Sequence, residues 1–170
     1  MYQELAGIAI VSMLATACSG RSPSTASPPP STGVQGQFTG GYLITSCVET
    51  GVFFSGLCGG TGSTVGSSFA LALSLTQNQA AVTGTITLGR SNGTPLTGTF
   101  QGAIQPSGHL TGAAPLPPLL LLGTINRDVR AWDSTTAGNS LNGSFTLVHS
   151  SNTEAGAMTV SASLVQVTRP

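Results

Sequence analysis

Few side chains in this chain could carry out catalysis. The carboxylates outside the N-terminal segment are Glu49, Asp128, Asp133 and Glu154, each in a predicted loop or at a predicted strand end. Paired-carboxylate catalysis needs two such groups within about 5 to 10 Å, and nothing in their spacing brings two together. The sequence contains no nucleophile elbow, phosphate-binding loop or metal-spaced ligand cluster. It therefore predicts a protein that is not an enzyme and has no metal or cofactor, with an uncharacterised hydrolase as the alternative.

The two histidines fall in different predicted environments. His109 follows a turn glycine, so we expect a solvated loop residue. His149 shares the alternation of Phe145 and Leu147 at the end of a predicted strand, where its imidazole could face the mouth of a barrel. There it is either a hydrogen-bonded rim residue or a base or ligand. Catalysis would require His149 to lie beside one of the carboxylates in a cleft.

The single tryptophan is the best candidate for recognition. Trp132 is flanked by Arg130 and Asp133, and an aromatic ring beside charged groups suits the rim of a ligand pocket. The interpretation that Trp132 plugs the interior is nevertheless favoured over a place at the rim. With Tyr42 and His149, these residues give the set of candidate ligand-binding side chains: Trp132, Arg130, His149 and Tyr42.

Charge is scarce along the whole chain. Only 6% of the 170 residues are charged, the formal net charge is zero, and there is no lysine. The arginines are scattered from Arg21 to Arg169, so no basic stripe could neutralise a nucleic-acid backbone. Cytosolic proteins usually have about a quarter of their residues charged, so the composition favours an exported protein that does not bind nucleic acid.

The N-terminus carries the features of an export signal. Leu5 to Ala17 is an apolar run too short to span a hydrocarbon core of about 30 Å but of the length of a signal-peptide core. It ends in small residues, Ala15-Thr16-Ala17, and Cys18 follows.

The segment LATAC, which ends in Cys18, resembles the lipobox of bacterial lipoproteins. The resemblance implies cleavage before Cys18, lipidation of its thiol and acylation of the new amine, typically with palmitate. It also implies a membrane anchor in the cell envelope, at the outer membrane or cell surface, facing the periplasm or the exterior. An ordinary secretory signal cut at the same place is the alternative, and it would leave Cys18 as a free thiol.

Composition divides the chain into three parts. Residues 1–17 are the predicted signal peptide, and 18–35, rich in serine and proline, are a predicted disordered tether behind the lipidated cysteine. Residues 36–170 form the predicted globular domain, long enough for one hydrophobic core.

The cysteine count supports a disulfide in that domain. With Cys18 used for lipid, Cys47 and Cys58 remain as one pair for an oxidising compartment to join. Zinc is a poor alternative, because two cysteines without a nearby histidine leave the metal half coordinated.

Residues 69–88 show the clearest two-residue alternation of apolar and polar side chains, which predicts a β-hairpin. With Asn78 and Gln79 as the turn, Leu75 falls opposite Val82, and both apolar series share one face. A Thr-Gly motif then recurs at intervals along the following strands, with its glycines on the apolar side. We expect these glycines to relieve crowding where the sheet curls.

Two further turns are predicted from the same alternation. Around Asn92 and Gly93 we expect a three-residue loop with Gly93 as a left-handed bulge. Pro106–Gly108 forms the next turn and leaves Ile104 facing Leu110.

The segment after the second turn is less regular. Leu119–Leu122 is either a covered strand or a hydrophobic lip. Across Ile125–Trp132, one continuous strand would turn Arg127 inward, whereas a turn at residues 126–128 would leave it in water. We favour the turn.

About eight antiparallel strands in sequence predict an up-and-down meander that closes into a barrel, with a β-sandwich as the alternative. The hairpins resemble those of lipocalin and avidin-like barrels in pattern, but the chain lacks the lipocalin glycine-x-tryptophan start and the biotin-pocket tryptophans. We therefore expect a monomeric, membrane-anchored lipoprotein whose β-domain serves in binding or envelope structure, possessing no enzymatic role. The alternative is a lipocalin-like carrier of a small apolar ligand, and an envelope protein is the other candidate partner.

Overall fold

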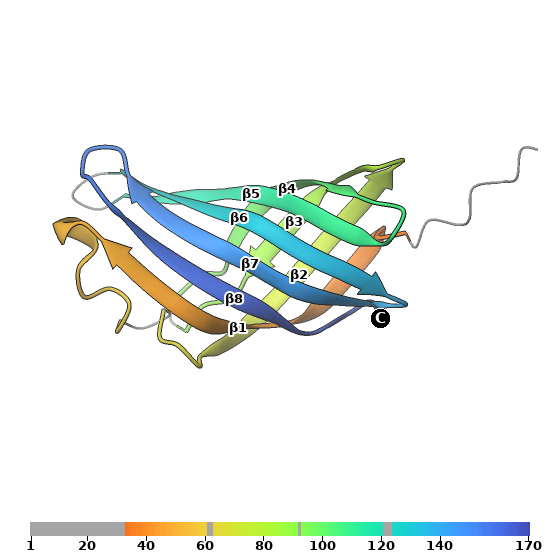
Figure 1. Ribbon diagram of the computed structural model, residues 1–170, viewed down its shortest axis with the longest axis horizontal. Helices are drawn as coiled ribbons and strands as arrows, with labels where there is room; N and C mark the ends of the chain where they lie inside the picture. Colours follow the sequence, from red (N-terminus) through yellow and green to blue (C-terminus); the bar gives the residue numbers. More distant parts are fainter. Residues whose placement is uncertain (1–32, 61–62, 92, 121–123) are drawn as a thin grey trace, which may run out of the picture.

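The computed structural model describes residues 33–170 apart from 61–62, 92 and 121–123. Eight antiparallel strands follow one another around a closed barrel, and β1 pairs with β8 to complete it (Figure 1). The predicted all-β meander barrel is thus confirmed. The strands are β1 Gly36–Thr50, β2 Ser68–Asn78, β3 Ala81–Leu88, β4 Leu96–Ile104, β5 His109–Leu120, β6 Thr124–Ala137, β7 Ser140–Ser151 and β8 Ala157–Thr168, with one 3-10 helix, η1 Val52–Phe54.

The β2–β3 hairpin keeps the predicted face and changes the predicted register. Leu75 lies opposite Gly84, and the turn residues are Gln79 and Ala80 rather than Asn78 and Gln79. The shift in pairing is two residues, so both apolar series still face the interior. Gln79 takes the left-handed conformation, with a φ of 55°.

The next two connections differ in how well the sequence predicted them. Leu88 pairs with Leu96, so the β3–β4 connection is a long loop and the expected three-residue turn is wrong. Gly93 does have a left-handed φ of 103°. The turn at Pro106–Gly108 is confirmed, because Ile104 lies opposite Leu110.

Strand β6 corrects a second expectation. It runs through the predicted turn at residues 126–128 without interruption, and Arg127 points inward between the buried side chains of Ile125 and Val129. A backbone break at this point would have left β5 and β7 without partners, and both pair with β6 here. Of the leucine run, Leu119 is half-buried and Leu120 is 75% exposed, while Leu121 and Leu122 lie outside the described residues.

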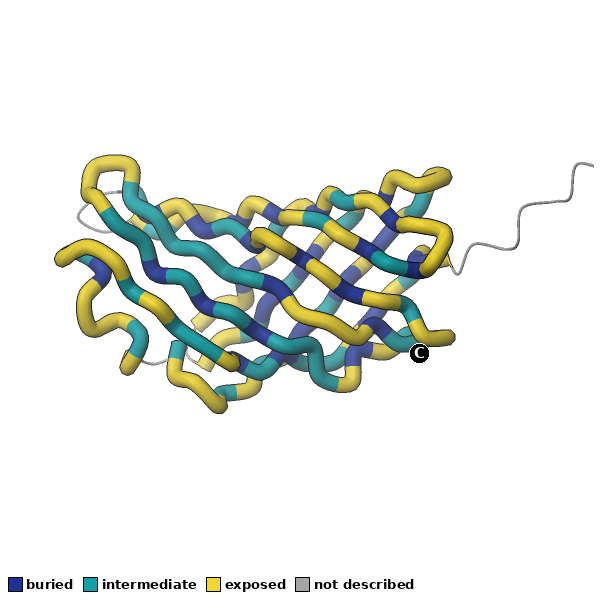
Figure 2. The backbone as a smooth tube through the Cα atoms, viewed as in Figure 1, coloured by how far each residue is buried: buried dark blue, intermediate teal, exposed yellow. Residues whose placement is uncertain are grey.

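The middle of the barrel is filled by aromatic side chains. The Trp132 ring stacks on Phe145 with centroids 5.4 Å apart and meets the edge of Phe100 at 5.6 Å. Phe145 in turn contacts Tyr42 at 5.4 Å, and Tyr42 contacts Phe69 at 5.6 Å. Buried segments alternate with exposed ones along the strands, as two-residue periodicity requires (Figure 2).

The inward glycines lie where neighbouring side chains or backbone leave no space for a Cβ. A Cβ added to Gly112 would lie 2.4 Å from Cζ of Phe100, and one added to Gly84 would lie 1.9 Å from the carbonyl oxygen of Ser74. Neither distance is compatible with a side chain, so the expected role of these glycines in relieving crowding is confirmed.

The two ends of the barrel are built differently. At the closed end, where β1 starts and β8 stops, the buried Val34 donates its N–H to Oε1 of Gln77 at 3.0 Å. Arg169 lies over the Phe38 ring, with Cζ 5.0 Å from the centroid, and donates to the Gly33 carbonyl. The opposite end, the loop end, carries η1, the long β3–β4 loop and the β7–β8 turn (Figure 1). No helix in the described part of the chain has the length and apolar character needed to cross a membrane.

Candidate functional site

The predicted disulfide is present at the loop end. Cys47 in β1 is bonded to Cys58 in the loop that follows, with their Cα atoms 5.6 Å apart. Glu49 supports the same loop, because its carboxylate accepts hydrogen bonds from the backbone N–H groups of Gly56, at 2.8 Å, and Cys58. The carboxyl group of Glu49 is therefore engaged in holding the loop in place.

The histidine that meets a carboxylate is His109. It opens β5, and its Nε2 lies 2.7 Å from Oδ1 of Asp133 on the outer wall of the barrel. Asp133 is largely exposed, so the pair contributes little, and His109 is half-buried at the start of a strand rather than in the solvated loop that we expected. His149 is placed elsewhere, in β7 at the loop end, opposite Arg127 of β6 and Met158 of β8.

Trp132 and Arg130 lie on opposite sides of the barrel wall. Trp132 is 1% exposed and donates its indole N–H to Oγ of Ser134 at 2.8 Å, which is the interior, space-filling position. Arg130 is exposed and pairs with Asp128 at 3.1 Å. A bulge at Ala131, with a φ of 47°, separates the two. The four candidate ligand-binding residues are therefore not gathered at one place.

Two of those four, Tyr42 and His149, belong instead to a group that we call the arginine cluster: Tyr42, Arg90, Arg127 and His149. Arg127 is 6% exposed, and its Nε donates to the Pro117 carbonyl at 2.8 Å. Arg90 follows β3 in the β3–β4 loop and is exposed. The Tyr42 hydroxyl donates to the carbonyl of Gly89 at 2.8 Å, which ties that loop to β1 next to Arg90.

The electrostatics show that these side chains act on one another. Burial, followed by the charges of Arg127 and Arg90, lowers the pKa of His149 to about 4, so the imidazole is neutral at pH 7. Burial raises the pKa of Tyr42 to about 12, and Arg90 opposes that shift. Burial and the charge of Arg90 both lower the pKa of Arg127.

The cluster has no carboxylate to balance it among the described residues. Glu49 holds the disulfide loop, Asp128 pairs with Arg130, and Asp133 pairs with His109. Glu154 lies exposed in the β7–β8 turn, and no acid contributes to the shifts in the cluster. The loop end therefore presents two cations and a neutral imidazole.

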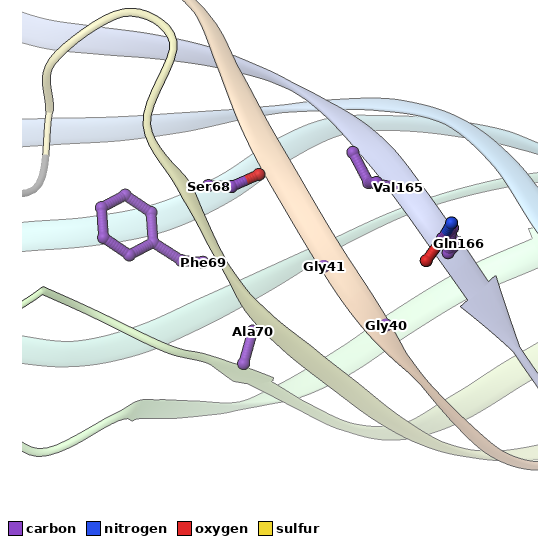
Figure 3. Close-up of a pocket in the computed structure, with 7 residues that line it drawn as sticks. All are labelled: Gly40, Gly41, Ser68, Phe69, Ala70, Val165 and Gln166. Atoms are coloured by element: carbon purple, nitrogen blue, oxygen red, sulfur yellow. The ribbon is translucent and has the colours of Figure 1, made fainter.

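A second candidate surface lies on the outer wall. A shallow depression of about 350 Å³ crosses β1, β2 and β8, where Gly40 and Gly41 leave the backbone uncovered (Figure 3). Its other lining residues are Ser68, Phe69, Ala70, Val165 and Gln166. None of these carries a titratable side chain, so the depression offers shape and backbone groups but no reactive group.

The sequence alone pointed to only part of the cluster. Arg127 has the parity of Ile125 and Val129, and this signal would have placed its side chain inside had the segment been treated as one strand. Arg90 stands in a loop, where alternation gives no direction, so nothing in the sequence connected it with Tyr42.

Within the described ranges, no three His, Cys, Asp or Glu side chains gather in a way that could hold a metal ion. Comparison with known proteins found no family model, curated protein or solved structure that matches the chain.

Proposed function

We propose that the protein is an exported bacterial lipoprotein, anchored through a lipid on Cys18, whose barrel is a non-catalytic binding domain in the cell envelope. The observation that carries the proposal is the concentration of unused binding groups at the loop end. There the arginine cluster lies in an otherwise packed barrel, and its buried guanidinium on Arg127 has no acidic partner in the described chain. Charged side chains that are held in place without an acidic partner are typical of binding sites.

The exposed apolar side chains also favour a binding site at the loop end. In the part of the chain that the structure describes, the large apolar side chains that remain exposed are Val48, Val52, Leu57, Val65 and Leu120. They lie in the last part of β1, in η1 and the loop after it, and at the end of β5, all at the loop end. Exposed apolar groups gathered at one place favour contact with a ligand or partner.

A lipocalin-like carrier of a small apolar ligand is the second candidate. It is favoured by Phe69 and Leu147, which face the interior near the loop end and are only half-buried. The aromatic stack from Tyr42 to Phe100 fills the space below them. A ligand would therefore sit at the loop end rather than deep along the barrel axis.

The anchor is tested on the full-length chain expressed in a bacterium with lipoprotein processing. We expect mass spectrometry of the mature N-terminus to find a diacylglyceryl group on Cys18, and the protein to partition with membranes. The matched variant Cys18→Ala should move to the aqueous fraction without loss of the fold. An unmodified thiol at Cys18 in the mature protein would contradict the lipoprotein assignment.

A further inference from the structure

The guanidinium of Arg127 has N–H donors for which the described chain supplies no acceptor. An arginine has five N–H donors in one plane, and only the Nε donor of Arg127 has a protein acceptor, the carbonyl of Pro117. Arg127 as a whole is 6% exposed, but Nη1 and Nη2 are not among the buried side-chain atoms that lack a partner, so they reach solvent at the loop end. The fork formed by Nη1 and Nη2 therefore remains accessible to a ligand, and it matches the two oxygens of a carboxylate or phosphate.

Arg90 adds a second cation on the solvent side. It is close enough to influence the pKa values of Tyr42, Arg127 and His149, which lie in β1, β6 and β7. Arg90 has no ion pair among the described residues, and its exposed side chain is free to close over a bound anion. The Tyr42–Gly89 hydrogen bond holds the backbone beside Arg90 at the barrel wall.

The neighbours of the cluster are apolar. Phe69 contacts Tyr42 with ring centroids 5.6 Å apart and is half-buried, as are Leu147, two residues before His149, and Leu119 near the end of β5. These side chains would cover hydrocarbon adjacent to the two arginines. A simple inorganic ion would leave that surface unused.

From these observations we infer that the arginine cluster binds the anionic group of an amphiphile, a carboxylate or phosphate attached to a short hydrocarbon portion, with the anion on Arg127 and Arg90 and the hydrocarbon on Phe69, Leu119 and Leu147. The inference rests on the proposed binding function and names its ligand class. Since the aromatic stack fills the middle of the barrel, the hydrocarbon lies at the loop end and along its exposed leucine and valine side chains.

The test is calorimetric titration of the purified protein with decanoate at pH 7.5, with decanol as the neutral control of similar length and inorganic phosphate as the control without hydrocarbon. We expect decanoate to bind, and decanol and phosphate each to bind at least tenfold more weakly. Arg127→Gln should weaken decanoate binding roughly tenfold or more, as expected for loss of a bidentate charged contact, and Arg90→Gln about threefold. Arg130→Gln, an exposed arginine of the same strand on the outer wall, is the matched control and should leave the affinity unchanged.

Vesicles distinguish the two sources of such an anion. Binding to vesicles of anionic phospholipid that is lost in Arg127→Gln would identify a lipid headgroup, and binding of decanoate without vesicle binding would identify a free amphiphile. Arg127→Lys, which keeps the charge and removes the fork, should give an intermediate affinity and serves if the glutamine variant does not fold.

The inference is overturned if decanoate does not bind, if decanol binds as tightly as decanoate, or if the Arg127 variants keep the affinity of the parent. Equal binding of decanol and decanoate would leave a binding domain for neutral apolar ligands in place. An unmodified Cys18 would remove the anchor and leave the anion site untouched, so the two proposals fail separately.

Discussion

The two ends of the barrel each hold an inward arginine, and they use it differently. At the closed end, Arg169 lies on the face of Phe38 and donates to the Gly33 carbonyl, so its charge helps to seal the barrel over Val34. At the loop end, Arg127 makes one hydrogen bond, to Pro117, and faces a neutral histidine across the sheet. Arg169 is packed into the closed end, where its Nε is buried without a hydrogen-bond partner in the described chain, while Arg127 keeps Nη1 and Nη2 available to a ligand.

The largest expected change in the free energy of unfolding distinguishes the packed closed end from the exposed loop end. Phe38→Ala at the closed end should lower the free energy of unfolding by about 3 to 5 kcal/mol, because it removes a buried ring and the surface under Arg169. Val52→Ser at the loop end, where the side chain is 93% exposed, should change it by less than about 0.5 kcal/mol. Urea denaturation of both variants measures the difference. Similar losses in the two variants would contradict the contrast between the ends.

The loop end should respond to pH through His149. Its pKa is lowered to about 4, so the unfolded chain binds a proton more readily than the folded one. Stability is therefore complete above the usual histidine pKa and falls as the pH drops from about 6.5 to about 4, by up to about 3 kcal/mol from this residue. Arg127 and Arg90 repel the imidazolium, and Tyr42 of the same cluster stays neutral over this range.

The measurement is thermal or urea unfolding between pH 7.5 and pH 4 in the parent and in His149→Gln. The variant should lose most of this part of the pH dependence. An identical pH profile in both proteins would show that His149 does not titrate as its surroundings require.

The disulfide tests whether the loop end is held by covalent bonding more than by packing. Cys58→Ser should cost on the order of 2 to 3 kcal/mol, because the closed loop between Cys47 and Cys58 is short. We also expect faster hydrogen exchange in η1 and the loop after it, with the closed end unchanged. Exchange that rises equally at both ends would argue against independent roles for them.

The smallest expected change in the free energy of unfolding has opposite signs at the closed end and the loop end. Arg169→Met should lower the free energy of unfolding by about 1 kcal/mol through loss of the contact with the Phe38 ring. Arg127→Met should raise it by about 1 kcal/mol, because an apolar side chain of similar length replaces a buried charge with no acidic partner in the described chain. Denaturation of both variants at pH 7.5 measures these changes. A lower free energy of unfolding in Arg127→Met would mean that the charge of Arg127 stabilises the fold.

Alternation was enough to predict the barrel and the inward face of the β2–β3 hairpin. It predicted the shared face of Leu75 and Val82 although the pairing was shifted by two residues, because a shift by two preserves parity. It did not predict the length of the β3–β4 loop, which depends on contacts such as Tyr42 with Gly89 that lie far apart in the sequence.

The candidate site was harder to predict than the fold. Arg127 was assigned to a turn because a charge within an apolar series is usually excluded from the interior, and the structure buries it. Trp132 stood out because of its charged neighbours, yet a bulge at Ala131 places Arg130 on the outer face, and Asp133 faces outward by ordinary alternation. Such a bulge shifts the inward positions of β6 from odd to even residue numbers, so one uninterrupted alternation could not follow the strand.

Both ends of the described chain emerge at the closed end, where Gly33 contacts Arg169 (Figure 1). The N-terminal segment that carries the proposed anchor therefore joins the barrel at the end opposite the arginine cluster. Fusing a reporter to either terminus should likewise leave the opposite rim unobstructed.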